Sequence, residues 1–285
     1  MPSHPNFLII GANKSGTTSL YHYLKQHPEV FFPNIKEPMF FNYYLKDGED
    51  GKFRTQTVIK TFDSYSKLFK GSKNFKASGE ASTSYLANPY CADNIYDYNP
   101  AMKLIAILRN PIDRAFSNYL MYVRWGDEKR SFKQALKDEL DGKKLPQGKQ
   151  YIYLGRYVDS LKKYQDVFGE EKLKVFLQED LKENTHLIYK QICNFLDINS
   201  DFQPDISQRF NTNDSTEIRP VHSFLKKVNR RLPFAGYLPQ PIQKKIFSKP
   251  TIRQSDKNTL KDLYKQEINE LSDFLDRDLS YWLEK

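Results

Sequence analysis

A glycine-containing turn near the start of the chain carries the residues with the plainest chemistry. Residues 11–18 read GANKSGTT, in which Gly11 and Gly16 enclose four residues that include Lys14. This G-x-x-x-x-G spacing, between an apolar run and a helical pattern, is typical of a loop that binds phosphate. Backbone N–H groups of such a loop and the positive end of the following helix can hold an anion. The turn therefore predicts an anion-binding site.

The position of the lysine distinguishes this loop from a Walker motif. A Walker loop has lysine directly after its second glycine, where this chain has Thr17, and Lys14 instead precedes that glycine by two residues. No aspartate at a strand end is placed as a magnesium ligand either. These departures disfavour a magnesium-dependent kinase or NTPase. A plainer alternative is that the hydroxyls of Ser15, Thr17 and Thr18 only cap the helix.

A second candidate anion site follows another apolar run. Arg109 comes directly after residues 104–108, and Ser117 lies eight residues further on, in a predicted helix. An arginine can fork onto a phosphate, and at ~1.5 Å per residue the hydroxyl is about 10 Å along the helix, within reach of an elongated ligand. Taken alone, the stretch could equally hold an ordinary surface arginine. Coupled to the first loop, this stretch predicts a second anion site on a neighbouring strand end.

A carboxylate or a histidine can act as a general base, and a well-placed base contributes roughly 10²–10⁴ in rate. The candidates are Glu37, Glu80 and a histidine. Glu37 stands in KEPMFF (residues 36–41), next to apolar residues. The alternative for Glu37 is a loop carboxylate held by Lys36 or another cation.

The elements that must position these groups alternate between strands and helices. Apolar runs predict buried strands at residues 7–10, 104–108 and 174–177. Helical spacing predicts helices at residues 18–26, from Pro111 with Asn110 as cap, at 187–196 and at 260–275. In the second helix the core-facing residues are expected to be Ile112, Ala115, Phe116, Tyr119, Leu120 and Val123, with Ser117 off that face.

This alternation predicts an α/β fold: a P-loop-like three-layer sandwich with a central parallel sheet and helices on both faces. No repeat or composition break divides the chain, so we expect a single domain over residues 1–285. Residues 141–150 and 211–220 are rich in polar and turn-forming residues and are expected to be exposed connections.

Composition narrows the class of protein further. The 285 residues are 39% apolar with a net charge of +9, which suits a packed core and an anionic partner. Cys91 and Cys193 are too few for a disulfide framework and lack metal-ligand spacing, so no metal site and a reducing compartment are expected. No leader-like or membrane-spanning run of ~20 apolar residues is visible, so we expect a cytoplasmic protein without stable membrane insertion.

The motifs resemble those of a known family. KSGTTSL at residues 14–20 resembles the 5′-phosphosulfate loop of sulfotransferases that use 3′-phosphoadenosine 5′-phosphosulfate (PAPS). His27-Pro28 and KEPMFF resemble the Golgi-type glycan (heparan sulfate-like) sulfotransferases and their bacterial relatives. The resemblance implies that Lys14 neutralises the oxygen bridging phosphorus and sulfur. It implies a 5′-phosphosulfate site made by Lys14, Ser15, Gly16, Thr17, Thr18 and Ser19.

The same resemblance implies roles for the other candidates. Arg109 and Ser117 match the family's 3′-phosphate site, and Glu37 matches its catalytic base. Many glycan-type members have lysine where this chain has Ala81, so a second catalytic cation is not implied, and Glu80 is left to orient the acceptor or to bind Lys14. The family's adenosine-covering loop has no clear match in this sequence, and Arg219 and residues 249–253 are the candidates for it.

Together these observations predict a sulfotransferase. PAPS is the expected co-substrate and PAP (3′,5′-ADP) the expected product, with no metal required. The expected acceptor carries a hydroxyl group. A carbohydrate is the first candidate, and lipids or small alcohols come second. A P-loop kinase or NTPase is the first alternative. A basic nucleic-acid-binding module is the second, although aromatic residues at core spacing, rather than interleaved with basic ones, speak against a nucleic-acid partner. The acceptor, the choice between oxygen and nitrogen, and the oligomeric state are left open.

Overall fold

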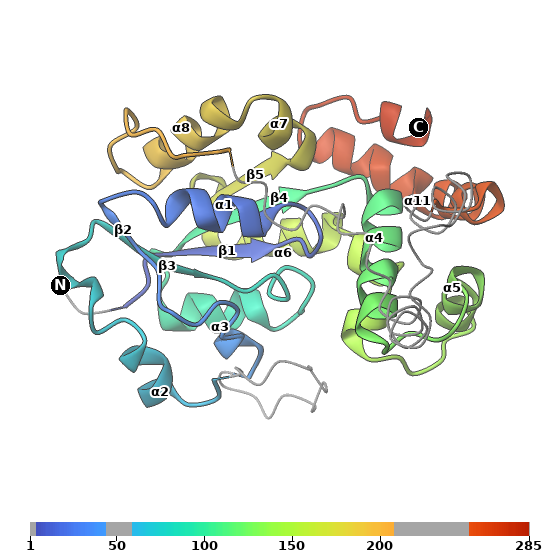
Figure 1. Cartoon of the computed structure of the whole chain (residues 1–285), viewed down its shortest axis with the longest axis horizontal. Coiled ribbons are helices and arrows are strands. Elements are labelled where there is room, and N and C mark those ends of the chain that lie inside the picture. Colours follow the sequence, from blue (N-terminus) through green and yellow to red (C-terminus); the bar gives the residue numbers. More distant parts are fainter. Residues whose placement is uncertain (1–3, 44–58, 208–250, 285) are drawn as a thin grey trace, which may run out of the picture.

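The protein is built around a sheet of five parallel strands in the order β2-β3-β1-β4-β5 (Figure 1). The structure is a computed structural model that describes residues 4–43, 59–207 and 251–284. The strands are β1 (Phe7–Gly11), β2 (Val30–Phe31), β3 (Ala77–Ala81), β4 (Lys103–Leu108) and β5 (Leu173–Leu177). All neighbouring strands run parallel, which confirms the predicted sheet.

Helices follow most of the strands, as parallel connections require. They are α1 (Thr17–Leu24), α2 (Phe62–Lys67), α3 (Cys91–Tyr98), α4 (Pro111–Trp125), α5 (Phe132–Leu140), α6 (Val158–Phe168), α7 (Gln178–Glu183), α8 (Thr185–Phe195), α11 (Gln254–Phe274) and α12 (Tyr281–Glu284). The helices predicted from residues 18, 111, 187 and 260 correspond to α1, α4, α8 and α11. Asn110 caps α4 as predicted, because its side chain accepts a hydrogen bond from the N–H of Ile112.

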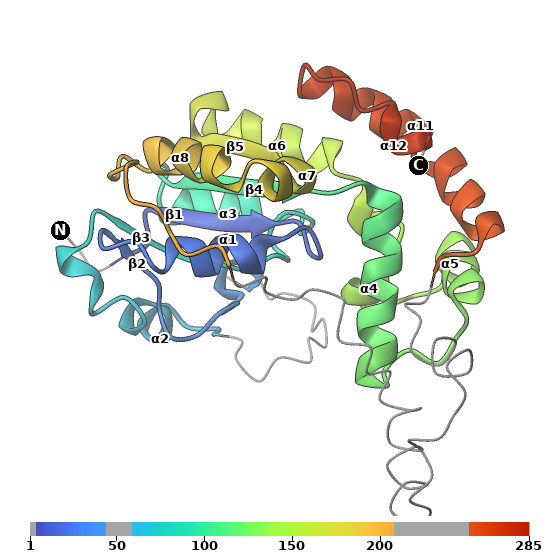
Figure 2. The same ribbon diagram turned by 45° about the horizontal axis from the view of Figure 1, so that its top comes forward.

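The two faces of the sheet carry two separate cores. Along β1, Leu8 and Ile10 pack with α3, α6 and α11, whereas Phe7 and Ile9 pack with α1 and α8 on the other face. This alternation follows from the two-residue period of a strand. Helices on both faces confirm the three-layer arrangement (Figure 2).

Two details of the sheet differ from expectation. Strand β5 was predicted to be buried throughout, but only Leu173 and Leu177 are buried, because β5 is an edge strand. Strand β3 was missed, because its sequence ASGEA lacks the apolar residues by which a buried strand is usually recognised. Gly79 is required there, since a Cβ atom would lie 2.6 Å from the carbonyl oxygen of Phe7.

Helix α4 stands beyond the carboxyl ends of the strands, to the right of the sheet in Figures 1 and 2. The apolar face predicted for this helix is only partly correct, because Ile112 and Ala115 are buried but the other four predicted residues are half-buried. The polar side of the helix is buried as well, at Arg114, Ser117 and Asn118, whereas Leu120 and Val123 are half-buried. The reason is that this polar side contacts a neighbouring segment: Asn118 donates to the carbonyl oxygen of Gly148 at 2.9 Å, and Arg114 donates to that of Tyr151.

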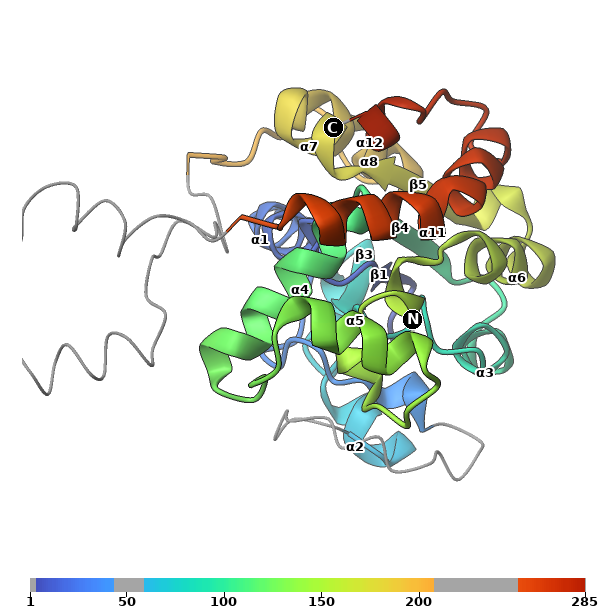
Figure 3. The ribbon, with the colours of Figure 1, turned by 90° about the vertical axis from the view of Figure 1, so that its right-hand side faces the viewer.

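Helix α11 crosses α4 and α6 and joins the C-terminal part of the described chain to the same core (Figure 3). Of the connection predicted at residues 141–150, residues 141–144 are exposed as expected, whereas residues 147–150 are half-buried and include a 3-10 turn at Gln147–Lys149. The other predicted connection, residues 211–220, lies outside the described residues. Among the residues that the structure describes, no helix is both long and apolar enough to cross a membrane.

Candidate active site

The phosphate loop joins the end of β1 to the start of α1. Gly16 is the N-cap of α1 and adopts φ 97°, a left-handed conformation that glycine tolerates best. No side chain caps this helix end, so the N–H groups of Thr17 and Thr18 can bind a ligand, whereas the N–H of Ser19 donates to the carbonyl oxygen of Gly16 at 3.0 Å. The hydroxyl of Ser15 is fully buried and has no hydrogen-bond partner among the described residues. A buried orphan hydroxyl beside open N–H groups fits the oxygen atoms of a bound phosphate or sulfate group.

These facts also decide the plainer alternative, in which the loop hydroxyls merely cap α1. Thr18 uses its Oγ1 atom to accept a hydrogen bond from Lys36, not to cap the helix. Thr17 is buried at the helix start. The capping interpretation is therefore not supported by the structure.

Arg109 lies against the loop. Its Nη1 atom donates to the carbonyl oxygen of Lys14 at 3.2 Å, and Nε2 of Gln178 reaches the same oxygen at 3.5 Å. The structure thus brings the end of β4 and the loop after β1 together, as the carboxyl ends of neighbouring parallel strands must meet. The contact of Gln178, at the start of α7, with the loop was not predicted, because nothing in the sequence around Gln178 indicates a hydrogen bond to a distant loop.

Ser117 lies on the buried polar side of α4, three per cent exposed. One residue further, Oδ1 of Asn118 accepts a hydrogen bond from Nδ2 of Asn13 at 3.4 Å. Met121, one helical turn beyond Ser117 on the same side of α4, places its sulfur 3.7 Å from Nζ of Lys14, so this side of the helix faces the phosphate loop. Of the predicted adenosine-covering residues, Arg219, Lys249 and Pro250 lie outside the described residues, whereas Arg253 is exposed at the start of α11.

Positive charge accumulates at this edge of the sheet. Burial, reinforced by the guanidinium groups of Arg124 and Arg109, lowers the pKa of Lys14 to about 8, and Glu37 only partly opposes this. The Nζ atom of Lys14 lies 3.7 Å from the sulfur of Met121 on α4. The protein thus concentrates cations here beyond what its own carboxylates balance, which fits an anionic ligand.

Glu37 lies at the same edge and is paired with Lys36. The Nζ atom of Lys36 is 3.2 Å from Oε1 of Glu37 and 3.1 Å from Oγ1 of Thr18. Glu37 has φ 57° and donates its backbone N–H to the carbonyl oxygen of Ala81 at 3.1 Å, which fixes the loop against β3. Lys36 had been considered only as a partner for Glu37. Its contact with Thr18 could not be read from the sequence.

Glu80 is a different kind of carboxylate. It is one per cent exposed and accepts hydrogen bonds from Oη of Tyr85 at 2.7 Å, Oγ of Ser82 at 2.8 Å and Oη of Tyr65 at 3.4 Å. Burial raises the pKa of Glu80 to about 7, although the hydrogen bonds from Tyr85 and Ser82 oppose the shift. The suggested bond to Lys14 is not found, and the partners of Glu80 are hydroxyl groups.

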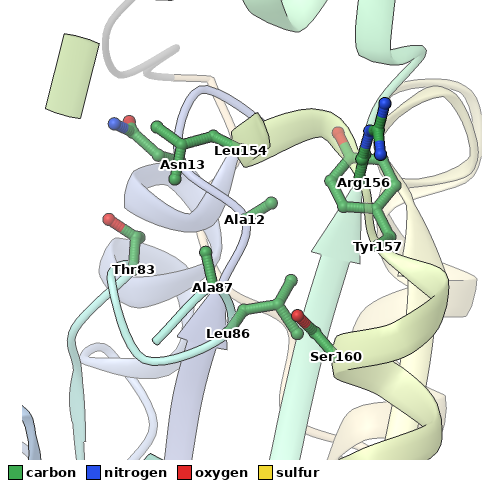
Figure 4. A pocket seen from close by; sticks show the side chains of 9 residues that line it. All are labelled: Ala12, Asn13, Thr83, Leu86, Ala87, Leu154, Arg156, Tyr157 and Ser160. Atoms are coloured by element: carbon green, nitrogen blue, oxygen red, sulfur yellow. The ribbon is translucent and has the colours of Figure 1, made fainter. Parts of the chain in front are cut away.

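A pocket opens beside the loop (Figure 4). Its walls come from three segments: Ala12 and Asn13 of the loop, Thr83, Leu86 and Ala87 after β3, and Leu154, Arg156, Tyr157 and Ser160 around the start of α6. In Figure 4, Asn13 and Thr83 lie on one side, with Arg156 and Tyr157 across from them. The pocket is mainly apolar and has a few polar groups at its edge.

No cluster of three metal-ligating side chains occurs in the described ranges 4–43, 59–207 and 251–284. Cys91 and Cys193 are buried free thiols. His27 is engaged structurally, with Nε2 2.8 Å from the carbonyl oxygen of Asn199. The expectation that no metal is required stays a prediction.

A parallel sheet with a phosphate loop after its first strand and a basic strand end beside it defines a P-loop-like nucleotide-binding protein. Comparison with known proteins specifies the family. The family profile described as "Sulfotransferase domain" matches residues 4–218, and the chain belongs to this family. The prediction made from the KSGTTSL and KEPMFF motifs is thereby confirmed, and with it the classification as a sulfotransferase.

Individual relatives agree. The crystal structure of a sulfotransferase from Alicyclobacillus acidocaldarius is 31% identical, has a TM-score of 0.75 and shares 98% of each chain. The membrane-associated sulfotransferase kil1 of Dictyostelium discoideum is 36% identical over 121 residues, 42% of this chain and 24% of that protein. Carbohydrate sulfotransferase 15 of Mus musculus is 32% identical over 152 residues, 41% of this chain and 27% of that protein. The chain thus matches only about a quarter of each of these two longer relatives.

Proposed function

We propose that this protein transfers the sulfuryl group of PAPS to a hydroxyl group of a carbohydrate and releases PAP. The observation that carries the proposal is the cation-rich edge of the sheet, where the phosphate loop, Arg109 and the Lys36–Glu37 pair meet. A donor with phosphate at two positions needs two cationic sites, and an acceptor hydroxyl needs a base beside the reacting sulfur. Membership of the sulfotransferase family supports the donor.

In the proposed reaction Glu37 accepts the proton of the acceptor hydroxyl while that oxygen bonds to sulfur. Lys14 neutralises the negative charge that collects on the phosphate oxygen as its bond to sulfur breaks. The loop and helix start at residues 14–19 hold the 5′ end of the donor, and Arg109 with Ser117 holds its 3′-phosphate. Interactions that strengthen as charge develops lower the barrier more than those equal in both states.

The carbohydrate acceptor is supported by the resemblance of KEPMFF to glycan-type enzymes and by the similarity to carbohydrate sulfotransferase 15. The pocket beside Asn13 and Arg156 offers polar groups at the rim of an apolar surface, which suits a sugar ring approaching the loop. A screen of acceptors with labelled PAPS, read by mass shift, tests this. If only amines accept the sulfuryl group, the acceptor atom is nitrogen and the proposed transfer to a hydroxyl group is wrong.

The donor is tested by ligand-induced stabilisation. PAP at 100 times its dissociation constant adds about 2.7 kcal/mol to the free energy of unfolding, and AMP or ATP should add far less because neither carries a 3′-phosphate. Ser117→Ala should reduce the advantage of PAP over AMP, whereas the exposed Lys25→Met should not. Equal stabilisation by PAP and AMP in the unmodified protein would contradict a 3′-phosphate site at Arg109 and Ser117.

A further inference from the structure

The ammonium group of Lys36 occupies a position between the phosphate loop and the proposed base. It donates to Oγ1 of Thr18 at 3.1 Å and to Oε1 of Glu37 at 3.2 Å. It also lies 5.9 Å from the centre of the Tyr21 ring, within the range of a cation–π contact. Since Thr18 and Tyr21 belong to α1 and Glu37 to a separate loop, the group is held from two directions.

Stability alone does not account for this placement. The side chains of Lys36 and Glu37 are 27% and 26% exposed, and a partly exposed ion pair between adjacent residues contributes at most about 1 kcal/mol. Thr18, by contrast, is the second residue of α1, at the helix end where N–H groups are left open and an anion is favoured. The charge of Lys36 therefore lies where the ligand is expected.

Lys36 and Lys14 lie close enough to influence each other, since the charge of Lys36 contributes to the lowered pKa of Lys14. Their surroundings differ: Lys14 contacts Met121, and its pKa is lowered first by burial and then by Arg124 and Arg109. Lys36 contacts Thr18 and Glu37. Two like charges held near one another are unfavourable unless an anion is to be shared between them. Lys14 stands on the side of the 3′-phosphate site and Lys36 on the side of the base.

We infer that Lys36 is a second catalytic cation, which binds the sulfuryl oxygens of the donor and keeps the Glu37 carboxylate beside the reacting sulfur. This inference rests on the proposed function. As the acceptor oxygen bonds to sulfur, the bond from sulfur to the phosphate oxygen breaks and Glu37 takes the acceptor proton. The third N–H of the Lys36 ammonium binds a sulfuryl oxygen of the donor, and the N–H that reaches Glu37 also becomes available to the sulfuryl oxygens once Glu37 is protonated.

Binding of PAPS and PAP gives a direct test, because only PAPS carries the sulfuryl group. Lys36→Met removes the charge and nearly keeps the length of the side chain. It should weaken PAPS binding about 10-fold, the effect of losing one hydrogen bond to a charged group, and PAP binding less than about 2-fold. Lys36→Arg keeps the positive charge and should retain most of the preference of the protein for PAPS over PAP. Lys25→Met is the matched control, since Lys25 lies 5.7 Å from the same Tyr21 ring and has neither of the two hydrogen bonds of Lys36.

Equal losses of PAPS and PAP affinity in Lys36→Met, or no loss of either, would overturn the inference while leaving the proposed function intact. If the unmodified protein binds neither nucleotide, the donor assignment is wrong and the inference falls with it. Turnover adds a second criterion: in a Glu37→Gln background, Lys36→Met should lower turnover by a further factor of about 10. No further loss would show that Lys36 acts only by positioning Glu37.

Discussion

The phosphate loop after β1 and the cluster of Glu80 with the hydroxyl groups of Tyr65, Ser82 and Tyr85 lie on neighbouring strands, but they differ in the partners that they supply for a buried charge. At the loop, burial and the nearby Arg124 and Arg109 lower the pKa of Lys14 to about 8. At the cluster, burial raises the pKa of Glu80 to about 7. In both regions the protein disfavours the charged form, but only the cluster supplies close hydrogen-bond partners for it.

Three hydroxyls surround Glu80, so this group is satisfied by the protein itself. Their oxygens connect it to the base loop: Oγ of Ser82 accepts from the N–H of Met39 at 3.1 Å, and Oη of Tyr85 from that of Phe41 at 3.4 Å. The cluster is a support, whereas the loop is incomplete until an anion binds. Glu37 lies between them, and its charge raises the pKa of both Lys14 and Glu80.

The largest expected effect separates the two carboxylates. Glu37→Gln keeps the size of the side chain and removes its ability to accept a proton, so turnover should fall about 100-fold or more, while PAP binding changes little. Turnover with the acceptor found in the screen, together with PAP titration, measures both quantities. The acidic limb of the pH–rate profile should disappear in this variant.

The control for this comparison is Glu80→Gln, which should retain more activity because Glu80 only supports the base loop. Near-native turnover in Glu37→Gln together with an inactive Glu80→Gln would show that Glu80, and not Glu37, is the base. If both variants stay active, the proton goes to a histidine, to solvent or to the acceptor itself.

An intermediate effect concerns the cationic side. Because the pKa of Lys14 is lowered to about 8, the free protein loses this charge as the pH rises above 8. Binding of an anion must then restore the proton, so PAP affinity should fall by up to about 10-fold per pH unit between pH 8 and 10. Calorimetric titration at three pH values measures the slope.

Lys14→Arg is the matched variant, because a guanidinium keeps its charge across this range. Its PAP affinity should be nearly flat from pH 8 to 10. The same slope in both proteins would show that another group titrates. Lys14→Ala should lower turnover more than PAP affinity, since the charge acts mainly on the departing phosphate.

Changes at Glu80 should have the smallest effect on turnover but a clear effect on how the free energy of unfolding depends on pH. The pKa of Glu80 in the folded protein is above the ordinary value, so the folded state holds a proton that the unfolded state releases. The stabilisation is complete below about pH 4.5 and is lost as the pH rises through 7, on the order of 3 kcal/mol in all. Denaturant unfolding at pH 5 and pH 8 should show this loss, and Glu80→Gln should remove it. Glu37→Gln should still lose this stability between pH 5 and pH 8. The same loss in Glu80→Gln would show that a group other than Glu80 causes it.

Much of this site could be predicted from local sequence. The loop at residues 11–18 needs only a strand, two glycines and a helix in succession, and β1 showed this pattern plainly. The approach of Arg109 to the loop followed from the rule that parallel strands end at one edge. The carboxylates were harder, since Glu37 was selected by resemblance and Glu80 was considered mainly as a partner for acceptor or lysine.

The sequence by itself determined the phosphate loop, the cap at Asn110, the buried strands β1 and β4 and the family, because each depends on residues close together in the chain. Tertiary structure alone decided the contact of Lys36 with Thr18, the burial of Glu80 under Tyr65 and Tyr85, and the exposure of β5 at the edge. Whether a charge is paired, screened or buried depends on groups brought from distant segments. Helix caps and phosphate loops depend on residues that are close in the sequence, but the burial of a side chain and the electrostatic environment of a site exist only once the elements are packed.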